Sequence, residues 1–393
     1  MGEDWQMSPQ SQSPIRVMRI IARMNVGGPA VQVSGLMRGI NSQKFDHRLY
    51  TGFCTSDEAD YLNVVATDIE ATRIVGLGRR VNFGGDIKAL LSLVKAIRDF
   101  KPDVIHTHTA KAGAIGRIAS LVSMQKSIRV HTYHGHLLNG YFGSFKRLLV
   151  VMIERLLALT TQQLLAVGDK VRQDLLKAGI GKKNKFGLMP PGLEIVVLPL
   201  KTESKEFYAL NNDRLQCAFI GRVTQIKRPD RFLDVVSEIK KRQVKLDFFI
   251  AGDGELLETC RKRIATEELP VSVLGWQSNI ERVLSAADIV VLTSDNEGTP
   301  LSLIQAGMAG LPVVSTSVGS VSEVVLNNET GIVTDLDVQQ LADALENLAN
   351  DPRLRAQLGA TAKKFTLANF GVQRLVHDHE ELYKKLVSNQ AKS

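Results

Sequence analysis

Two basic side chains follow an expected strand early in the second half of the chain. Arg222 and Lys227 lie five positions apart in "GRVTQIK" (221–227), where an apolar run over 215–221 ends. Arginine donates hydrogen bonds as a planar fork and lysine acts as a point charge, so the pair suits a diphosphate group. The alternative is a solvated loop in which the two cations share no ligand.

A second stretch of this kind is "NEGTPLSLIQAGMAGLPVV" (296–314), which follows an apolar run over 288–294. Glu297 falls in the loop after that strand and can reach a ligand hydroxyl, while Gln305 lies further along the expected helix and faces the same cleft. The backbone N–H groups at the start of this helix can hold phosphate oxygens. The segment that would supply them is Gly298, Thr299, Pro300 and Leu301.

Two glycines interrupt this expected helix. Gly307 and Gly310 would each cost up to about 1 kcal/mol relative to alanine in a helix interior. They are explained if another element or a ligand packs closely there, with "GLP" (310–312) ending the helix.

The first half of the chain offers a glycine pair and several histidines. Gly27 and Gly28 open an expected helix after the first strand, without the G-x-G-x-x-G spacing of a dinucleotide site. They let the backbone approach a ligand closely, although many such turns need glycine only for packing. His134 follows another expected strand and is either a site residue or a structural histidine. Its nearby rivals are His106, His108, His131 and His136.

Short apolar runs alternate with amphipathic helical segments along the chain. Such near-continuous apolar strands are typical of parallel sheets covered on both faces, and 393 residues suit two domains. The sequence therefore predicts an α/β protein with two doubly wound, Rossmann-like domains facing across a cleft, where ligands would bind at the carboxyl ends of the strands. The expected divisions are a disordered tail (1–14), a first domain (15–198), a linker (199–213), a second domain (214–370) and a closing helix with a tail (371–393).

Composition and charge indicate the class of protein, its cellular compartment and the surfaces it could contact. Hydrophobic residues make up 44% and the three cysteines form no CxxC or Cys/His cluster, so we expect a globular cytoplasmic protein without a disulfide framework. From Gly140 to Phe186 there are nine Lys/Arg and three Asp/Glu among many leucines. Such a stretch suits an anionic membrane surface or a phosphate-bearing partner, or it is an ordinary solvated helix face. No segment suits nucleic acid or a bilayer span.

Taken together, the ordered motifs resemble family 4 retaining glycosyltransferases of the GT-B fold, in particular the branch that makes capsular and exopolysaccharides. The resemblance covers about residues 15 to 388. Besides the glycine pair and the stretches quoted above, it rests on "HTHTAKAGAIGRIAS" (106–120), "HTYHGH" (131–136), "AGDGE" (251–255) and "LGW" (274–276).

The resemblance implies a role for each candidate residue. Arg222 and Lys227 match the pair that binds the donor diphosphate, and Glu297 matches the first glutamate of the Glu-x7-Glu motif, which contacts the transferred sugar. Gln305 stands where the family's second glutamate holds the ribose, so here that position has lost its charge. His134 matches the active-site histidine.

The same resemblance implies the reaction and its partners. We expect transfer of a sugar from a nucleotide diphosphate donor, a UDP-sugar, to a saccharide or polyprenyl-diphosphate-linked acceptor, with neither metal nor cofactor. Lys111 and Arg117 lie in the acceptor half and are candidates for meeting acceptor phosphates. The alternatives are a non-catalytic sugar-nucleotide-binding module and a GT-B-like sugar-nucleotide 2-epimerase.

Overall fold

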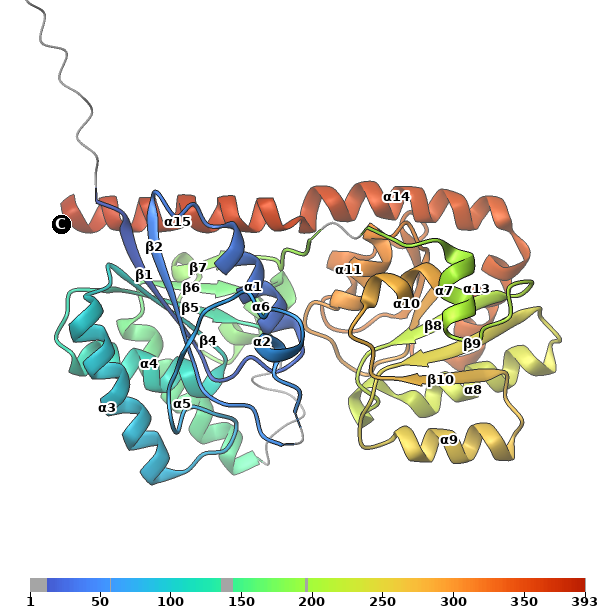
Figure 1. The fold of residues 1–393 in the computed structure, drawn as a ribbon, viewed down its shortest axis with the longest axis horizontal. Coiled ribbons are helices and arrows are strands. Elements are labelled where there is room, and N and C mark those ends of the chain that lie inside the picture. Colours follow the sequence, from blue (N-terminus) through green and yellow to red (C-terminus); the bar gives the residue numbers. More distant parts are fainter. Residues whose placement is uncertain (1–12, 57, 136–143, 195–196, 393) are drawn as a thin grey trace, which may run out of the picture.

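The structure is a computed structural model that describes residues 13–56, 58–135, 144–194 and 197–392; of the side chains, those of 144–147 are not described. The tail expected over 1–14 lies outside this part of the chain apart from Ser13 and Pro14, and so does His136. Two lobes lie side by side, and a pair of long helices runs along both of them (Figure 1).

The first domain is built on a seven-stranded sheet in the order β3-β2-β1-β4-β5-β6-β7, with every pairing parallel. Six of the seven strands overlap strand-like runs of the sequence, although β3 itself is only Thr72–Arg73. β7 was not predicted, because it has only three residues and a glycine at its centre. The strands are β1 (Ile15–Ile21), β2 (Phe45–Thr51), β3 (Thr72–Arg73), β4 (Val104–His108), β5 (Ile128–Tyr133), β6 (Gln163–Ala166) and β7 (Phe186–Leu188).

The second domain repeats this plan with six parallel strands in the order β10-β9-β8-β11-β12-β13. In both sheets the strand order reverses beside the first strand, at β1/β4 and at β8/β11, which are the points where doubly wound sheets bind ligands. The strands are β8 (Leu215–Ile220), β9 (Leu246–Ala251), β10 (Val271–Gly275), β11 (Ile289–Leu292), β12 (Val313–Thr316) and β13 (Gly331–Thr334).

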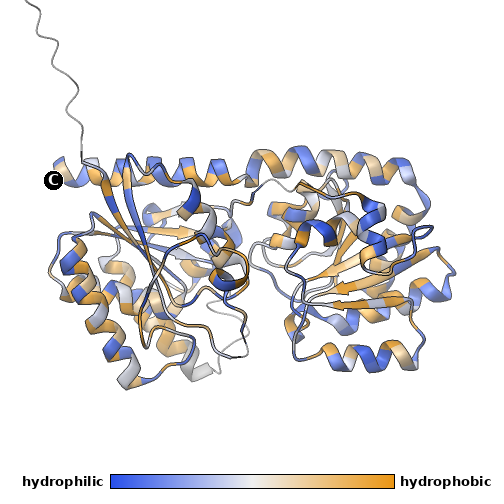
Figure 2. Cartoon of the chain, in the orientation of Figure 1, coloured by the Kyte–Doolittle hydropathy of each residue, from blue (hydrophilic) through white to orange (hydrophobic). Residues whose placement is uncertain are grey.

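Helices cover the faces of both sheets. Figure 2 shows mainly apolar strands, while the helices carry their polar residues on the outside. Among the described residues, no helix combines the length and the apolar character needed to cross a membrane. The first domain has α1 (Gly28–Gly39), α2 (Tyr61–Val64), α3 (Phe83–Phe100), α4 (Ala110–Val122), α5 (Ser144–Thr160) and α6 (Asp169–Lys177). The remaining helices are α7 (Lys201–Phe207), α8 (Pro229–Lys241), α9 (Leu257–Thr266), α10 (Ile280–Ala286), α11 (Leu301–Met308), α12 (Val321–Val324), α13 (Val338–Asn350), α14 (Pro352–Phe370) and α15 (Val372–Lys392).

The chain passes between the domains twice. The outgoing segment meets the returning one at Leu193, whose N–H donates to Phe370 O and whose O accepts from Val372 N–H. After this point α15 packs on α1 of the first domain, with Leu375 and Tyr383 fully buried. α15 thus lies where the sequence predicts a closing helix, and it joins the end of the chain to the first domain. The predicted linker over 199–213 is partly wrong, because α7 forms there and buries Ser204 against its surroundings.

Packing explains the two glycines of α11. A Cβ at Gly307 would lie 2.5 Å from the side chain of Thr366 in α14, so this position needs glycine for a close helix contact. Gly310 has φ of 77°, a left-handed conformation that ends the helix and that glycine adopts without strain. The contact with α14 accounts for Gly307 and the end of the helix accounts for Gly310, so neither glycine needs a ligand to explain it.

Candidate active site

The loops that follow β8 and β11 bring the predicted donor-binding residues together, because these two strands are neighbours in the sheet. Lys227 Nζ lies 2.5 Å from Glu297 Oε1, and Ser294 Oγ donates to the same oxygen at 2.5 Å. The Glu297 side chain is only 7% exposed. A buried carboxylate of this kind is stabilised by its ion pair and hydrogen bond, which also fix its position.

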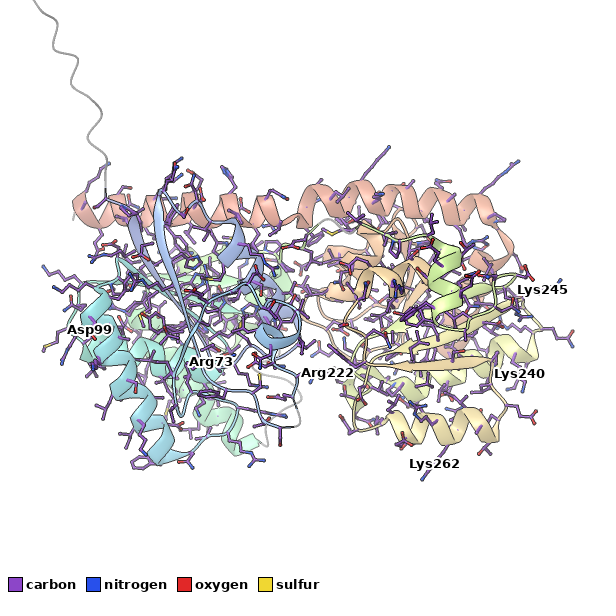
Figure 3. All side chains as sticks on the ribbon, in the orientation of Figure 1. Arg73, Asp99, Arg222, Lys240, Lys245 and Lys262 are labelled. Atoms are coloured by element: carbon purple, nitrogen blue, oxygen red, sulfur yellow. The ribbon has the colours of Figure 1, made fainter. Side chains whose placement is uncertain are left out.

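Arg222 belongs to the same region, directly after β8. Its side chain is exposed, and Figure 3 shows it at the side of the second domain that faces the first. A guanidinium there and the ammonium of Lys227 can both approach a bound diphosphate.

The loop from Glu297 to Leu301 contacts both domains. Ser320 N–H donates to the carbonyl oxygens of Glu297 and Gly298, each at 3.3 Å. Thr299 Oγ1 donates to Val167 O of the first domain at 3.1 Å. Pro300 is the N-cap of α11, whose first N–H groups have no carbonyl partner within the helix and can bind an anion.

His134 lies across from this loop, at the end of β5. Its carbonyl oxygen would be 3.0 Å from a Cβ at Gly298, and a Cβ at Gly135 would be 3.1 Å from the Gly298 Cα. Gly135 also has φ of 101°, a conformation that favours glycine. The two backbones are so close that a Cβ at either position would require the facing segment to shift by a few tenths of an ångström.

His134 is half-buried, and its Nε2 lies 2.9 Å from Nδ1 of His108. Burial, and then the charge of Arg19, lower the pKa of His134 to about 3. The imidazole is therefore neutral at physiological pH and can donate one hydrogen bond and accept another.

The rival histidines lie deeper in the domain. His106 is fully buried with Tyr383 and Thr132 as partners, and His131 bonds Thr107. His108 contacts His134 directly, so it belongs to the surroundings of the site. His136 lies outside the described residues.

The glycine pair opens α1 as predicted. Gly27 is the N-cap of α1, and a Cβ at Gly28 would lie 3.3 Å from the side chain of Leu301. The start of this helix therefore lies against the loop of the second domain, which places the two helix N-termini at one location.

Gln305 lies one turn into α11 and is half-buried; its role toward ribose stays a prediction.

The structure pairs both acceptor-side candidates with groups of the protein itself. Arg117 is fully buried, and its Nη2 lies 2.7 Å from both carboxylate oxygens of Glu154, so it holds α4 to α5 and meets no acceptor. Lys111 pairs with Asp86 at 2.7 Å and donates to the carbonyl oxygens of Gly76 and Arg80. Both cations therefore stabilise the fold.

The sequence contains one Asp-x-Asp, a pattern that can hold a divalent cation. It lies at 335–337, where Asp337 caps α13 by accepting from Gln340 N–H at 2.9 Å. In the part of the chain that the structure describes, no group of three or more His, Cys, Asp or Glu residues is placed to hold a metal ion.

Three residues near the site were not predicted from the sequence. Ser294 supports Glu297, Arg19 reaches His108 from β1, and Glu323 accepts from the N–H groups of Asp169 and Lys170 across the domains. A charged residue within the apolar run "IRVMRIIA" (15–22) is the signal that would have pointed to Arg19.

Comparison with known proteins agrees with this arrangement. The family described as glycosyl transferases group 1 matches residues 201–365, and the glycosyl transferase 4-like domain matches residues 27–192. Among curated relatives, the chain is 26% identical over 341 residues to the UDP-Gal:alpha-D-GlcNAc-diphosphoundecaprenol alpha-1,3-galactosyltransferase of Escherichia coli, covering 84% of this chain and 87% of that protein. It is 23% identical to the capsular polysaccharide glycosyltransferase CapM of Staphylococcus aureus over 326 residues, covering 80% and 85%.

Solved structures share the fold. HepE of Anabaena, crystallised with UDP and glucose, superimposes with a TM-score of 0.80 at 17% identity and covers 94% of this chain and 99% of its own. Sucrose-phosphate synthase of Thermosynechococcus elongatus gives 0.78 at 18% identity, covering 95% and 100%. With one family matching each domain and the donor-side residues gathered between them, the chain belongs to the group 1 and 4-like glycosyltransferases of the GT-B fold, enzymes that use nucleotide-sugar donors.

Proposed function

We propose that this enzyme transfers a sugar from a UDP-sugar to a saccharide or polyprenyl-diphosphate-linked acceptor in cell-surface polysaccharide synthesis, with retention at the anomeric carbon and without a metal ion. The observation that carries the proposal is that Gly298, which follows the Lys227–Glu297 ion pair in the chain, meets the backbone of His134 and Gly135 across the two domains. A carboxylate for sugar hydroxyls, cations for phosphates and a neutral imidazole close to one another would support this reaction.

The proposed chemistry depends on stabilising the leaving diphosphate. As the bond from the anomeric carbon to the phosphate oxygen breaks, its electron pair stays on the phosphate. Arg222, Lys227 and the first N–H groups of α11 then stabilise the growing negative charge. The acceptor oxygen forms its bond on the same face of the sugar, and its proton passes to the leaving phosphate oxygen. The residues thus supply electrostatics and orientation rather than a covalent nucleophile.

The relatives support the choice of donor and acceptor. The name of the Escherichia coli relative states a UDP-galactose donor and an acceptor carried on diphosphoundecaprenol, and HepE was solved with UDP and glucose. A polyprenyl diphosphate acceptor would also suit the anionic membrane surface expected from the sequence.

A donor screen tests this function. Purified protein is incubated with UDP-Gal, UDP-Glc, UDP-GlcNAc or GDP-Man, a polyprenyl-diphosphate-linked GlcNAc and EDTA, and released nucleotide and product linkage are measured. Release of UDP with an α-linked product supports the proposal, and the Lys227→Ala, Arg222→Ala double variant should lose this turnover. An inverted product, a requirement for divalent cation, or binding without turnover for every donor would contradict it.

We also propose that the enzyme works at the inner face of the plasma membrane, using a surface formed by α5. Five described side chains of this helix are more than 45% exposed although they are apolar: Leu148, Leu149, Met152, Leu156 and Leu159. Lys182 and Lys183 are exposed near the end of the same helix. Lys185, in contrast, donates to the carbonyl oxygens of Ala158, Leu159 and Thr161, so it caps α5 and does not belong to the surface.

Co-sedimentation with vesicles containing anionic lipid tests the surface. We expect Leu156→Glu, Leu159→Glu and the double variant Lys182→Gln, Lys183→Gln to reduce binding, and added salt to weaken what remains, because exposed charges are screened over about 8 Å at physiological ionic strength. Leu336→Glu is the control, since Leu336 is a 49% exposed leucine of the other domain. Equal binding by all variants would refute the membrane surface.

A further inference from the structure

A fully buried arginine lies at the centre of the first domain. Arg19 of β1 has no exposed surface, and among the described residues no ion pair includes it. Its partners are His47 (Nε to Nε2, 2.9 Å), His108 (Nη1 to Nε2, 2.6 Å) and the hydroxyl of Tyr383 (from Nη2, 2.7 Å). Burial lowers the pKa of Arg19, but an arginine side chain stays charged in proteins.

The chemistry of the guanidinium fixes the direction of every hydrogen bond around it. Its five N–H groups only donate, so each nitrogen or oxygen that it contacts must accept. Nε2 of His108 is therefore unprotonated. Since a neutral imidazole keeps one proton, that proton lies on Nδ1 of His108.

The same reasoning extends to His134. Nδ1 of His108 lies 2.9 Å from Nε2 of His134, and the proton on His108 makes it the donor. Nε2 of His134 must then accept, so the single proton of the neutral His134 ring lies on Nδ1. Three side chains thus form a chain of hydrogen bonds that all point one way, from Arg19 through His108 to His134.

A second branch holds this arrangement in place. Tyr383 of α15 accepts from Arg19, so its own proton goes to Nδ1 of His106 at 2.6 Å, and Nε2 of His106 donates to Thr132 at 2.7 Å. The rings of His106 and His108 stack with centroids 4.4 Å apart. The helix that closes the chain therefore takes part in fixing the ring of His108.

We propose that Arg19 and His108 are positioning residues that hold His134 in the Nδ1–H form, so that His134 donates a hydrogen bond from Nδ1 and does not accept a proton at Nε2. The proposal rests on the proposed function in one respect, that His134 meets the donor sugar. It adds that His134 donates a hydrogen bond to a sugar or phosphate oxygen. Because Nε2 of His134 already accepts a hydrogen bond from His108, it cannot act as a general base.

Nitrogen-15 NMR of histidine-labelled full-length protein tests the protonated form without donor or acceptor. Wild-type His134 should show a protonated Nδ1 and an unprotonated Nε2. His108→Asn keeps a donor near the position of Nδ1 and should preserve this pattern. His108→Phe keeps the ring that stacks on His106 but removes the donor, so His134 should shift toward the Nε2–H form.

Kinetics of the same variants separate positioning from a merely structural role. We expect His108→Phe to lower kcat roughly tenfold to a hundredfold with little change in the donor KM, and His108→Asn to recover most of the loss. An Nε2–H form of His134 in the wild type, or an unchanged kcat in His108→Phe, would overturn the proposal. If no donor supports transfer, the proposed function fails, while the spectrum still decides the state of His134. If His108→Phe does not fold, the wild-type and His108→Asn spectra provide the test.

Discussion

Lys227 and Glu297 form an ion pair, with Nζ 2.5 Å from Oε1, although they lie 70 positions apart and follow different strands. Their side chains are 19% and 7% exposed. The sequence assigned the lysine to the diphosphate and the glutamate to the sugar. Their contact means that one change of charge affects both functions, because each residue fixes the position of the other.

Replacing one and then both members of this ion pair should change the free energy of unfolding and the donor turnover in different ways. Lys227→Ala leaves Glu297 buried without its cation, which costs about 3 to 5 kcal/mol when one partner of a buried pair is removed. Adding Glu297→Gln removes the unpaired charge, so the double variant should recover much of the free energy of unfolding. Turnover should stay low in both, because the cation for the diphosphate is still missing. Denaturant unfolding and donor turnover measure the two effects, and wild-type turnover in either variant would contradict the assignment.

Gly135 and Gly298 predict a steric effect on the contact between the domains. Gly135→Ala would place a Cβ 3.1 Å from the Cα of Gly298 and would strain a backbone with φ of 101°. Gly275→Ala is the matched control, because Gly275 has φ of 69° but nothing within 4 Å of its Cβ position. We expect both to lose about 1 to 3 kcal/mol of stability, whereas only Gly135→Ala should also lose kcat/KM. Equal kcat/KM values would argue against a functional contact at Gly135.

Glu323 forms a contact between the two domains. Its carboxylate accepts from the N–H groups of Asp169 at 2.7 Å and Lys170 at 3.0 Å, at the start of α6 in the other domain. Glu323→Gln replaces charged hydrogen bonds by neutral ones, a loss of about 1 kcal/mol. Hydrogen exchange of the peptide that contains these two amides should therefore become faster. Glu329→Gln makes the same change of charge at an exposed site and should leave the exchange rate unaltered. Equal exchange rates in the two variants would show that the Glu323 carboxylate does not protect these amides.

The sequence was a good guide to the fold because both sheets are parallel and buried. Twelve of the thirteen strands overlap strand-like runs of the sequence, and the loops after them contain the donor-side residues. The segment "KTESKEF" (201–207) is polar, which favours a linker, yet it forms α7 and packs against α10.

The acceptor side could not be predicted in this way. Arg117 is paired by a glutamate 37 positions away, and no local pattern shows whether a cation will find a carboxylate in the core. Arg19 is similar, since its partners come from positions 28 to 364 residues away. Buried polar contacts between distant segments are decided by the tertiary structure, not by spacing along the chain.

The buried histidines predict loss of stability in mild acid. His106, His108, His131 and His379 are buried, and burial is the first cause that lowers their pKa values, to about 3 for His379. In the unfolded chain they would titrate near 6.5, so the unfolded state binds protons that the folded state does not. Stability is then complete above pH 6.5 and falls as the pH decreases below it, down to about pH 3 for His379.

Each of these histidines contributes up to about 1.4 kcal/mol per pH unit in this range. The free energy of unfolding should therefore decrease by up to about 5 kcal/mol between pH 7.5 and 5.5. Carboxylates titrate mainly below this window, so the change reports the histidines. Urea unfolding at several pH values measures it, together with the uptake of protons on unfolding. A constant free energy of unfolding from pH 7.5 to 5.5 would show that these histidines titrate in the folded protein as they do in the unfolded chain, so that burial does not lower their pKa values.

Gln305 is the last residue to test, because the resemblance implies that it stands at the second glutamate of the Glu-x7-Glu motif. If it binds the ribose, Gln305→Glu restores a charged acceptor in the half-buried first turns of α11. A hydrogen bond to a charged group contributes about 1.5 to 3 kcal/mol and a neutral one about 0.5 to 1.5. We therefore expect UDP to bind about fivefold more tightly, as measured by calorimetry, and sugar transfer to become faster. Weaker UDP binding by Gln305→Glu would mean that the site has adapted to the amide. No UDP binding by either form would show that the donor does not bind at this site.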